Sequence, residues 1–264
     1  MSKTHTVLLK KEPKLKLTWL VLNRPDKLNA FNEDLARDLQ SGLLEVEEDK
    51  GTRVLIITGA GDKAFSAGAD ISAFTAGMTP MRAQYSSAKG HEIFSIVQRL
   101  PQPVIAAING YAFGGGCELA MVCDFRLAAK RAKIGLTEVG LGLLPGWGGT
   151  QLMPRIIGLA KAKEAIMFAK RFTADEALQI GLVHRVFADE TFEEDVRTFA
   201  KTLAEQSPIS LNLVKQCMNY GTQAPLETGL LFESQAFGKL FSTQDLFEGI
   251  AAFLQKRRPE YKGE

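Results

Sequence analysis

Cysteine and histidine are scarce in this sequence. Its 264 residues include three cysteines, Cys117, Cys123 and Cys217, and three histidines. An odd number of cysteines without a Cys-x-x-Cys pair indicates neither a disulfide framework nor a zinc site. The histidines lie far apart in the sequence, which argues against a metal centre and against a Ser-His catalytic pair. We therefore expect a reduced protein without a bound metal.

A strong net charge and long apolar runs are also missing. The 32 basic and 30 acidic side chains nearly balance, so the overall charge favours neither nucleic acid nor an anionic membrane as a partner. No apolar stretch approaches the roughly 20 residues of a membrane-spanning helix. Lys10, Lys11 and Lys14 come before any apolar run long enough for a signal peptide. These features predict a soluble, cytoplasmic protein without nucleic-acid or membrane partners.

The chain does contain alternating strand and helix patterns over its first two thirds. Residues 6–11 and 15–22 are apolar-rich and flank a turn, which predicts a hairpin. Residues 54–59 form a short, continuous apolar run, typical of a strand covered on both faces. Further strands are predicted at residues 103–108, 125–129 and 133–136, and helices from Asn32 through Leu43 and at residues 82–100. This order predicts a layered α/β core.

Beyond about Pro154 the periodicity is mainly helical. Helices are predicted at residues 160–168, 174–180, 192–206, 208–220, 225–241 and 243–256. Thr173 and Thr243 stand at positions suited to capping two of them. Apolar faces, such as the one that includes Leu230 and Phe237, must be buried either on the core or on a neighbouring subunit.

Two glutamates beside glycine-rich backbone are the main candidates for chemistry. Glu118 closes the run GGGCE at residues 114–118, after a predicted strand and within an otherwise apolar helix. A place on the exposed surface does not fit that neighbourhood, whereas a structural salt bridge stays open. Glu138, in GLTEVG at residues 135–140, is less constrained by its neighbours. Two carboxyls near exposed backbone amides are suited to proton transfer beside a polarised carbonyl.

The glycine runs by themselves are also compatible with a purely structural role. A tight turn from strand to helix accounts for a glycine run without any ligand. A dinucleotide-binding loop requires G-x-G-x-x-G, which the run at residues 114–116 does not complete. The second run begins at Gly140, but Pro145 occupies its last position. The G-x-x-x-x-G-K-[ST] phosphate loop is also missing, so a nucleotide-binding fold is disfavoured.

Several longer motifs, in the same order, are similar to those of the crotonase, or enoyl-CoA hydratase/isomerase, superfamily. They are LNRPDKLNA at residues 22–30, AFSAGADI at 64–71, NGYAFGGGCEL at 109–119, PGWGGTQ at 145–151 and FSTQD at 241–245. The resemblance covers nearly the whole chain. It implies an α/β fold of the crotonase (ClpP-like) type, built from repeated ββα units with a helical C-terminal region. Because this scaffold hosts many reactions on acyl-CoA thioesters, the reaction has to be argued from the site.

The resemblance also implies a division of the chain and an assembly. Residues 1–200 would form the α/β core with the CoA-binding and catalytic site, and residues 201–264 a helical region for trimerisation. A homo-oligomer, either a trimer or a dimer of trimers, is therefore expected.

The resemblance assigns catalytic roles to four residues at matching motif positions. The backbone N–H groups of Ala69 and Gly115 would form an oxyanion hole for the thioester carbonyl. Relatives that hydrate trans-2-enoyl-CoA carry two glutamates, which match Glu118 and Glu138. In that scheme Glu118 activates the attacking water and Glu138 delivers a proton to the α-carbon. The product is a 3-hydroxyacyl-CoA, and no cofactor is needed because coenzyme A is part of the substrate.

Other matching residues are implied to contact the coenzyme A moiety. The loop that contains Ala67, Ala69, Asp70 and Ile71 would hold its adenine and pantetheine portions. Lys27 would meet its phosphates.

Three residues nearer the C-terminus complete the implied site. Phe253 and Lys256 of the last helix would help to enclose the CoA moiety, often from an adjoining subunit. Trp147 stands where many relatives have a small residue. Its indole either narrows the acyl pocket toward short or polar chains, or only packs the turn or a subunit contact.

Three other functions stay open at this point. An enoyl-CoA isomerase, which typically keeps only the second glutamate, or a hydratase for a branched substrate such as methylglutaconyl-CoA, would use the same scaffold. A non-catalytic protein of this fold that binds RNA is the third alternative. The balanced charge and the presence of both Glu118 and Glu138 argue against RNA binding.

Overall fold

The computed structural model describes residues 5–73 and 77–264, whose strands form two sheets. The first sheet has the order β1-β2-β3-β5-β7-β10. Its strands are β1 (Val7–Glu12), β2 (Leu17–Leu22), β3 (Val54–Gly59), β5 (Val104–Ile108), β7 (Phe125–Ala129) and β10 (Arg185–Phe187). The β1–β2 hairpin is antiparallel, as predicted, and the remaining neighbours are parallel.

The second sheet is smaller, and its strands alternate in sequence with those of the first. Its order is β4-β6-β8-β9, with β4 (Ala64–Ser66), β6 (Tyr111–Phe113), β8 (Lys133–Gly135) and β9 (Phe172–Thr173). Each of β4, β6 and β8 follows a strand of the first sheet and precedes a helix. The chain therefore repeats a ββα unit, which confirms the implied fold.

The helices confirm most of the predicted periodicity. The α-helices are α1 (Glu33–Glu48), α2 (Pro80–Arg99), α3 (Gly115–Val122), α4 (Gly149–Ile157), α5 (Leu159–Met167), α6 (Ala174–Gln179), α7 (Phe192–Ala204), α8 (Pro208–Gly221), α9 (Leu226–Leu240) and α10 (Gln244–Leu254). Short 3₁₀ segments are η1 (Pro25–Lys27), η2 (Ile71–Ala73) and η3 (Glu138–Leu141). The helix boundaries lie within a few residues of the predicted ones.

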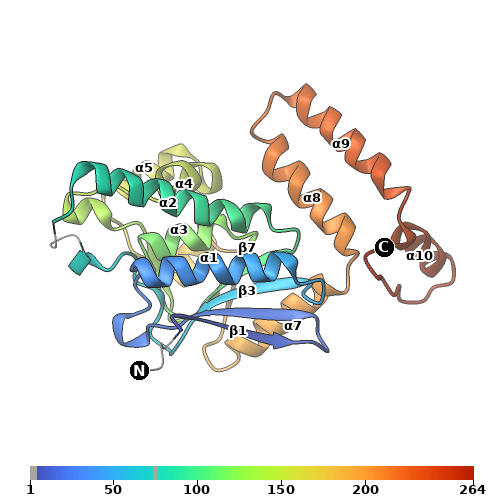
Figure 1. Ribbon diagram of the computed structural model, residues 1–264, viewed down its shortest axis with the longest axis horizontal. Helices are drawn as coiled ribbons and strands as arrows, with labels where there is room; N and C mark the ends of the chain where they lie inside the picture. Colours follow the sequence, from blue (N-terminus) through green and yellow to red (C-terminus); the bar gives the residue numbers. More distant parts are fainter. Residues whose placement is uncertain (1–4, 74–76) are drawn as a thin grey trace.

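The first sheet is covered on both faces, as the continuous apolar run of β3 predicted. Leu55 and Ile57 belong to the core formed with α1, α2 and α3. Val54 and Ile56 point the other way and pack with α7. Alternate residues of a strand face opposite sides, so a strand with no polar face needs two apolar partners. Figure 1 shows α1, α2 and α3 on one side of the sheet and α7 on the other.

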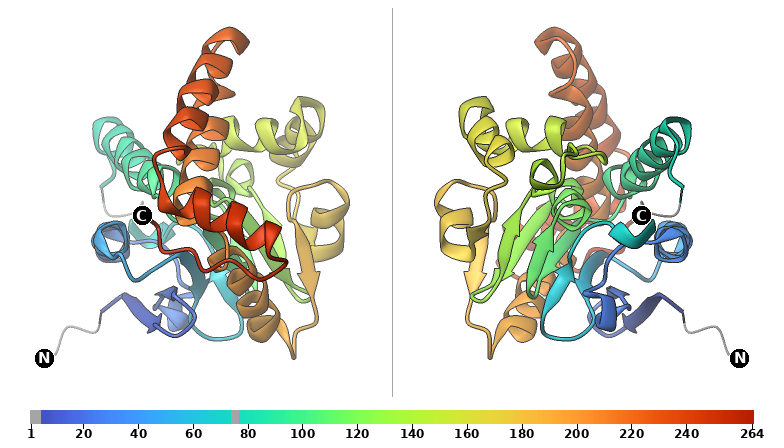
Figure 2. Two further views of the ribbon diagram at one scale, coloured as in Figure 1. Left: turned by 90° about the vertical axis from the view of Figure 1, so that its right-hand side faces the viewer. Right: turned by 90° about the vertical axis from the view of Figure 1, so that its left-hand side faces the viewer.

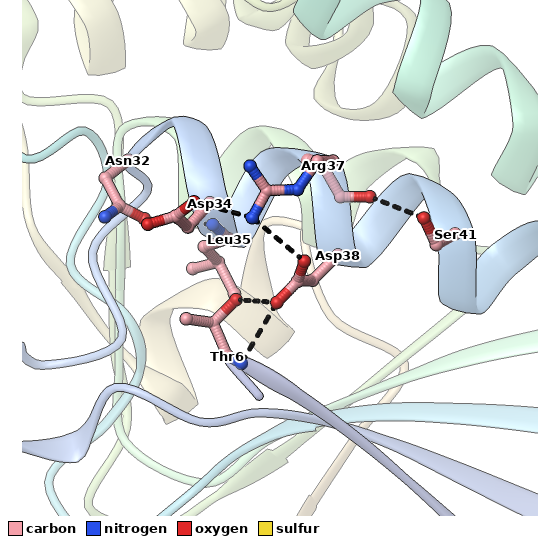
Figure 3. A network of polar contacts seen from close by, with 7 residues as sticks. All are labelled: Thr6, Asn32, Asp34, Leu35, Arg37, Asp38 and Ser41. Atoms are coloured by element: carbon pink, nitrogen blue, oxygen red, sulfur yellow. Dashed lines mark hydrogen bonds and ion pairs between the residues drawn. The ribbon is translucent and has the colours of Figure 1, made fainter. Parts of the chain in front are cut away.

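Helix α1 begins at the predicted cap and is tied to the edge strand. The Asn32 side chain accepts a hydrogen bond from the Leu35 backbone N–H at 2.9 Å, which satisfies one free donor of the first turn. Asp38 accepts from both the hydroxyl and the backbone N–H of Thr6, at 2.7 and 3.1 Å. Figure 3 shows this network between the helix and the residue before β1.

Residues 207–264, here called the helical arm, project from the core. Figure 1 shows α8 and α9 side by side with α10 beyond them, and Figure 2 shows the same arm from its end. Lys215 of α8 is buried and anchors the arm to the core, through an ion pair with Asp124. The predicted division after residue 200 falls inside α7, and Ala204 of that helix still packs on the first sheet.

Four short strands and one helix were not predicted from the sequence. Strands β4, β6, β9 and β10 have two or three residues each, too few for an alternating pattern to be read. Helix α4 contains Pro154, which is read as a helix breaker. The residue four before it is Thr150 in the first turn, so the proline removes one hydrogen bond near the helix start rather than from the middle of a long helix.

Candidate active site

The carboxyl ends of three neighbouring strands meet at one edge of the second sheet. β4 pairs in parallel with β6, and β6 pairs in parallel with β8. The chain leaves β4 through residues 67–70, leaves β6 into α3, and leaves β8 toward η3. Clefts outside the carboxyl ends of parallel strands are frequent ligand sites. This topology brings Ala69, Gly115, Glu118 and Glu138 together, although up to 69 positions separate them in the sequence.

Glu118 lies on α3 and is only 2% exposed. Its Oε1 atom accepts hydrogen bonds from the backbone N–H groups of Trp147 and Gly149, each at 2.8 Å. Both donors belong to the turn that leads into α4. A charge-assisted bond of this kind fixes the carboxylate and favours its ionised form. The sequence left open a structural salt bridge for Glu118; in the structure its partners are instead these two backbone N–H groups.

The turn at residues 145–149 approaches Glu118 so closely that Gly149 admits no side chain. A Cβ atom at Gly149 would lie 2.7 Å from Leu136, 2.8 Å from Pro145 and 3.0 Å from Glu118 Oε1. Real Cβ contacts are almost never as short as the first two of these distances. Glycine therefore lets the backbone donor reach the carboxylate, which is a common reason for glycine near a functional group.

Glu138 begins η3, which follows β8 after two residues, Leu136 and Thr137. Its Oε1 atom would lie 3.1 Å from a Cβ atom placed on Gly114, so the carboxyl lies against the glycine run that precedes α3. Its Oε2 atom is buried and has no hydrogen-bond partner among the described residues. A buried carboxyl oxygen without a partner is costly and in most proteins marks a position where a ligand or water completes the bonding.

The two carboxyls hold protons more tightly than isolated glutamates. Burial raises the pKa of Glu118 to about 7; the negative charge of Glu138 adds to the rise, and the N–H groups of Gly149 and Trp147 oppose it. Burial also raises the pKa of Glu138. Two interacting carboxyls lose their protons in steps that belong to the pair. Between those steps the pair holds one proton, the state needed to offer a base and an acid at once.

Two backbone donors lie beside these carboxyls. Gly115 is the first residue of α3, so its N–H group has no acceptor within the helix. Ala69 forms a parallel bridge with Phe31 through the carbonyl of Gly68 and the N–H group of Asp70. In such a bridge the N–H group of the central residue points to the opposite side.

The loop that carries Ala69 also lies against the start of α3. A Cβ atom on Gly68 would lie 3.4 Å from the Gly115 nitrogen and 2.9 Å from the Phe113 carbonyl oxygen. Gly68 has φ +96°, which disfavours any other residue there. The two predicted donors therefore belong to adjacent backbone segments, and Ala69 is exposed to solvent.

A family model described as enoyl-CoA hydratase/isomerase matches residues 15–264. The chain belongs to this family. A crotonyl-CoA hydratase from Syntrophomonas wolfei is 43% identical over 257 residues, which are 97% of this chain and 98% of the relative. A short-chain-enoyl-CoA hydratase from Clostridium acetobutylicum is 41% identical over 256 residues, 97% of each chain. The crystal structure of an enoyl-CoA hydratase from Bacillus anthracis superposes with a TM-score of 0.93 at 42% identity, covering 98% of this chain and 100% of that one.

In this member of the enoyl-CoA hydratase/isomerase family, the residues expected around the adenine and pantetheine lie near the edge of the second sheet where β4, β6 and β8 end. The Ala67 N–H group donates to the Leu28 carbonyl at 2.9 Å, which joins the loop after β4 to the segment that carries Lys27. Lys27 and Ile71 are both exposed. Asp70 forms an ion pair with Arg24 at 3.1 Å, and its contact with coenzyme A stays a prediction.

Phe253 and Lys256 do not join this group within one chain. Phe253 is on α10 and 82% exposed, and Lys256 follows the same helix and is also exposed. Figure 1 shows α10 beyond α8, on the side away from α3. A contact between these two residues and a ligand at Glu118 would therefore have to come from another copy of the chain.

Trp147 combines packing with a place in the site. Its indole makes edge contacts with Phe31 and Phe94, at ring-centroid distances of 5.0 and 5.3 Å. A Cβ atom placed on Gly115 would lie 3.5 Å from the indole, so the ring also backs the predicted oxyanion donor. The side chain is half-buried.

The backbone partners of Glu118 were not predicted from the sequence. The pair Gly148-Gly149 was the available signal for them, since adjacent glycines often mark a close backbone approach. Ser87 and Gly90 of α2, which contact the same turn, were not predicted either.

None of the helices in residues 5–73 and 77–264 has the length and apolar character needed to cross a membrane. Those residues also include no group of three or more His, Cys, Asp or Glu side chains arranged to hold a metal ion.

Proposed function

We propose that the protein hydrates trans-2-enoyl-CoA thioesters to 3-hydroxyacyl-CoA, or catalyses the reverse dehydration. The observation that carries the proposal is the pair of carboxyls, the buried Glu118 and the half-buried Glu138, beside the backbone N–H groups of Ala69 and Gly115. Relatives that are 41–43% identical over nearly the whole chain are hydratases by name.

In the proposed mechanism the oxyanion donors and the two carboxyls act on the same bound substrate. The thioester carbonyl accepts hydrogen bonds from Ala69 and Gly115, which stabilise the negative charge that develops when water adds to the β-carbon. Ionised Glu118 takes a proton from that water as its oxygen bonds to the β-carbon. Protonated Glu138 gives its proton to the α-carbon as the enolate collapses. The pair ends with its single proton on Glu118, and in dehydration the two roles exchange.

The same proposal covers the partners and the setting. The substrate is an acyl-CoA thioester, and we favour a short chain. The reaction is neither an oxidation nor a reduction, so the proposal includes no redox cofactor. It includes no metal because the N–H groups of Ala69 and Gly115 would polarise the carbonyl. We further propose a cytoplasmic homo-oligomer, a trimer or a dimer of trimers, in lipid metabolism. Its apolar contacts would come from exposed side chains of the helical arm, such as Leu230 and Phe237.

The test is loss of the ultraviolet absorbance of the enoyl thioester, followed across acyl chain lengths. We expect turnover that is highest for the four-carbon substrate. Product analysis by mass spectrometry should show the addition of one water. A shifted double bond without added water would instead identify an isomerase, and no turnover of any enoyl-CoA would contradict the proposal.

The pH dependence of hydration is expected to be bell-shaped. The one-proton state exists in two forms, and the form with ionised Glu118 and protonated Glu138 is the one that hydrates. This state is lost when the pair gives up its last proton as pH rises past the raised pKa of Glu118, about 7, and it is also lost in acid when both carboxyls are protonated. We therefore expect kcat/KM to fall about tenfold per pH unit well above pH 7. The alkaline fall of kcat should lie at higher pH than that of kcat/KM. Bound substrate excludes water from the two carboxyls, and this disfavours their ionised forms further. A flat kcat/KM between pH 5 and 9 would contradict the paired mechanism.

Replacing Trp147 by alanine is expected to relax the chain-length preference. The indole is half-buried beside Gly115, so its removal enlarges the space available to an acyl chain. We expect the ratio of kcat/KM for eight-carbon over four-carbon enoyl-CoA to rise by about tenfold, the low end of the effect of a single methylene group in an apolar pocket. The ratio is the measurement because it cancels any general loss of activity. An unchanged ratio would mean that the indole only packs the turn.

A further inference from the structure

Helix α2 contacts the turn that holds Glu118 at two points on one face. Ser87 and Gly90 are three residues apart, so they lie on the same side of the helix. The Ser87 hydroxyl donates to the Gly146 carbonyl oxygen at 2.5 Å. Gly90 is buried, and a Cβ atom there would lie 2.5 Å from three atoms of the Trp147 indole. The indole therefore lies directly on the helix backbone at Gly90.

These contacts continue through the turn to the catalytic carboxyl. The Gly146 carbonyl and the Trp147 N–H group belong to the same peptide unit, which is planar. One side of this unit accepts from Ser87, and the other donates to Glu118 Oε1 at 2.8 Å. The indole attached to the same residue is further fixed by Phe31 and Phe94. A shift of the carbonyl must therefore shift the N–H donor, and a shift of the ring, which Phe31 and Phe94 confine, pushes on the same residue.

We propose that Ser87 and Gly90 are positioning residues of the hydratase site, which hold the Gly146–Trp147 peptide so that its N–H group keeps Glu118 ionised and oriented. The proposal rests on the hydratase function given above. Neither residue touches the reacting atoms. Ser87 fixes the peptide through its carbonyl, and Gly90 leaves the space that the indole fills.

The effect of these two residues on the peptide can be measured through the ionisation of Glu118. Among the described residues, the charged group that faces Glu118 from another element is Glu138 of η3. Cys117, next to it on α3, stays a neutral thiol because burial raises its pKa. The N–H groups of Trp147 and Gly149 lower the pKa of Glu118, so losing one of them raises that pKa. The last proton then leaves the pair at higher pH, and less of the pair carries its charge on Glu118.

The decisive experiment is a double-mutant cycle between Gly90 and Trp147. We expect Gly90→Ala to lower kcat/KM by about tenfold to 100-fold, because a displacement of about 1 Å costs that much at an active site. Its alkaline limb should also move to higher pH. In the Trp147→Ala background the collision no longer exists, so the same Gly90→Ala change should alter kcat/KM by less than about twofold. Equal losses in both backgrounds, or an unmoved limb, would overturn the proposal.

Two further variants test the Ser87 contact and provide a control. Ser87→Ala creates no collision and should still shift the limb upward, with a loss of about fivefold in kcat/KM, the value of one hydrogen bond. Ser95→Ala is the matched control, because it also removes a hydroxyl of α2, an exposed one that donates only to the Glu92 carbonyl of the same helix. It should leave both the rate and the limb unchanged. A limb that stays in place in Ser87→Ala would count against the hydroxyl contact.

An infrared titration separates this proposal from the proposed function. The band of the protonated Glu118 carboxyl, taken as the difference between the wild-type protein and Glu118→Gln, should titrate at higher pH in Gly90→Ala and Ser87→Ala. This measurement does not depend on turnover. An unshifted band would overturn the positioning role even if hydration is found. A shifted band in a protein that hydrates no enoyl-CoA would support the positioning role and contradict the hydratase function.

Discussion

Glu118→Gln is expected to lower kcat for hydration by about 10²–10⁴-fold, the usual contribution of a positioned general base. The amide has nearly the same shape and can still accept from the Trp147 and Gly149 N–H groups, so the fold should be kept. What it cannot do is take a proton from water. The measurement is steady-state hydration of a four-carbon enoyl-CoA, with KM expected to change much less than kcat.

Glu138→Gln is the matched variant for the second carboxyl. It should reduce hydration by a similar factor, because the α-carbon then lacks its proton donor. The double variant should be little worse than either single one, since the two groups act as a unit. Hydration that survives Glu118→Gln at the full rate would contradict the two-carboxyl mechanism.

Lys215→Ala is expected to lower the free energy of unfolding by about 3–5 kcal/mol, the cost of breaking a buried ion pair from one side. The Lys215 side chain is 7% exposed, and its Nζ atom lies 2.8 Å from Asp124 Oδ2. It also donates to the carbonyls of Val97 and Gln102, at 3.0 and 3.1 Å. Removal leaves the carboxylate without its cation and two buried carbonyls without a donor.

Urea unfolding followed by circular dichroism would measure this loss. Lys201→Ala is the control, because that lysine makes an exposed contact with Glu205 at 4.0 Å and should change stability by about 0–1 kcal/mol. Replacing both partners, as Lys215→Met with Asp124→Asn, should recover part of the loss because no unpaired charge remains. Equal effects of the two lysine substitutions would show that the Lys215 pair contributes little to stability.

Much of the fold could be predicted because its longer elements carry local signals. The β1–β2 hairpin, the strand at β3 and the helix capped by Asn32 were confirmed, since periodicity and capping act over neighbouring residues. Strands β4 and β6 were not predicted, although β8, which is equally short, was: each of the two has only three residues and runs directly into a glycine-containing stretch that indicates a loop. They form only where strands from separate repeats pair.

The candidate site was predictable in its parts and not in its assembly. Glu118 was indicated by its apolar helix, and its burial is confirmed. The amide donors of Trp147 and Gly149 were not predicted, since backbone groups are the same at every residue and their use depends on which segments approach each other. The distance of Phe253 from Glu118 within one chain likewise follows from how the helical arm projects.

The sequence by itself determined the family, the two candidate carboxyls and the scarcity of metal-binding residues. Motifs in a fixed order and the type of each residue suffice for these conclusions. The tertiary structure decided that Glu118 is held by two amides, that its pKa is raised to about 7, and that Ser87 and Gly90 contact the turn that holds it. A pKa depends on burial and on nearby charges and donors, and these arise only when segments far apart in the chain are packed together.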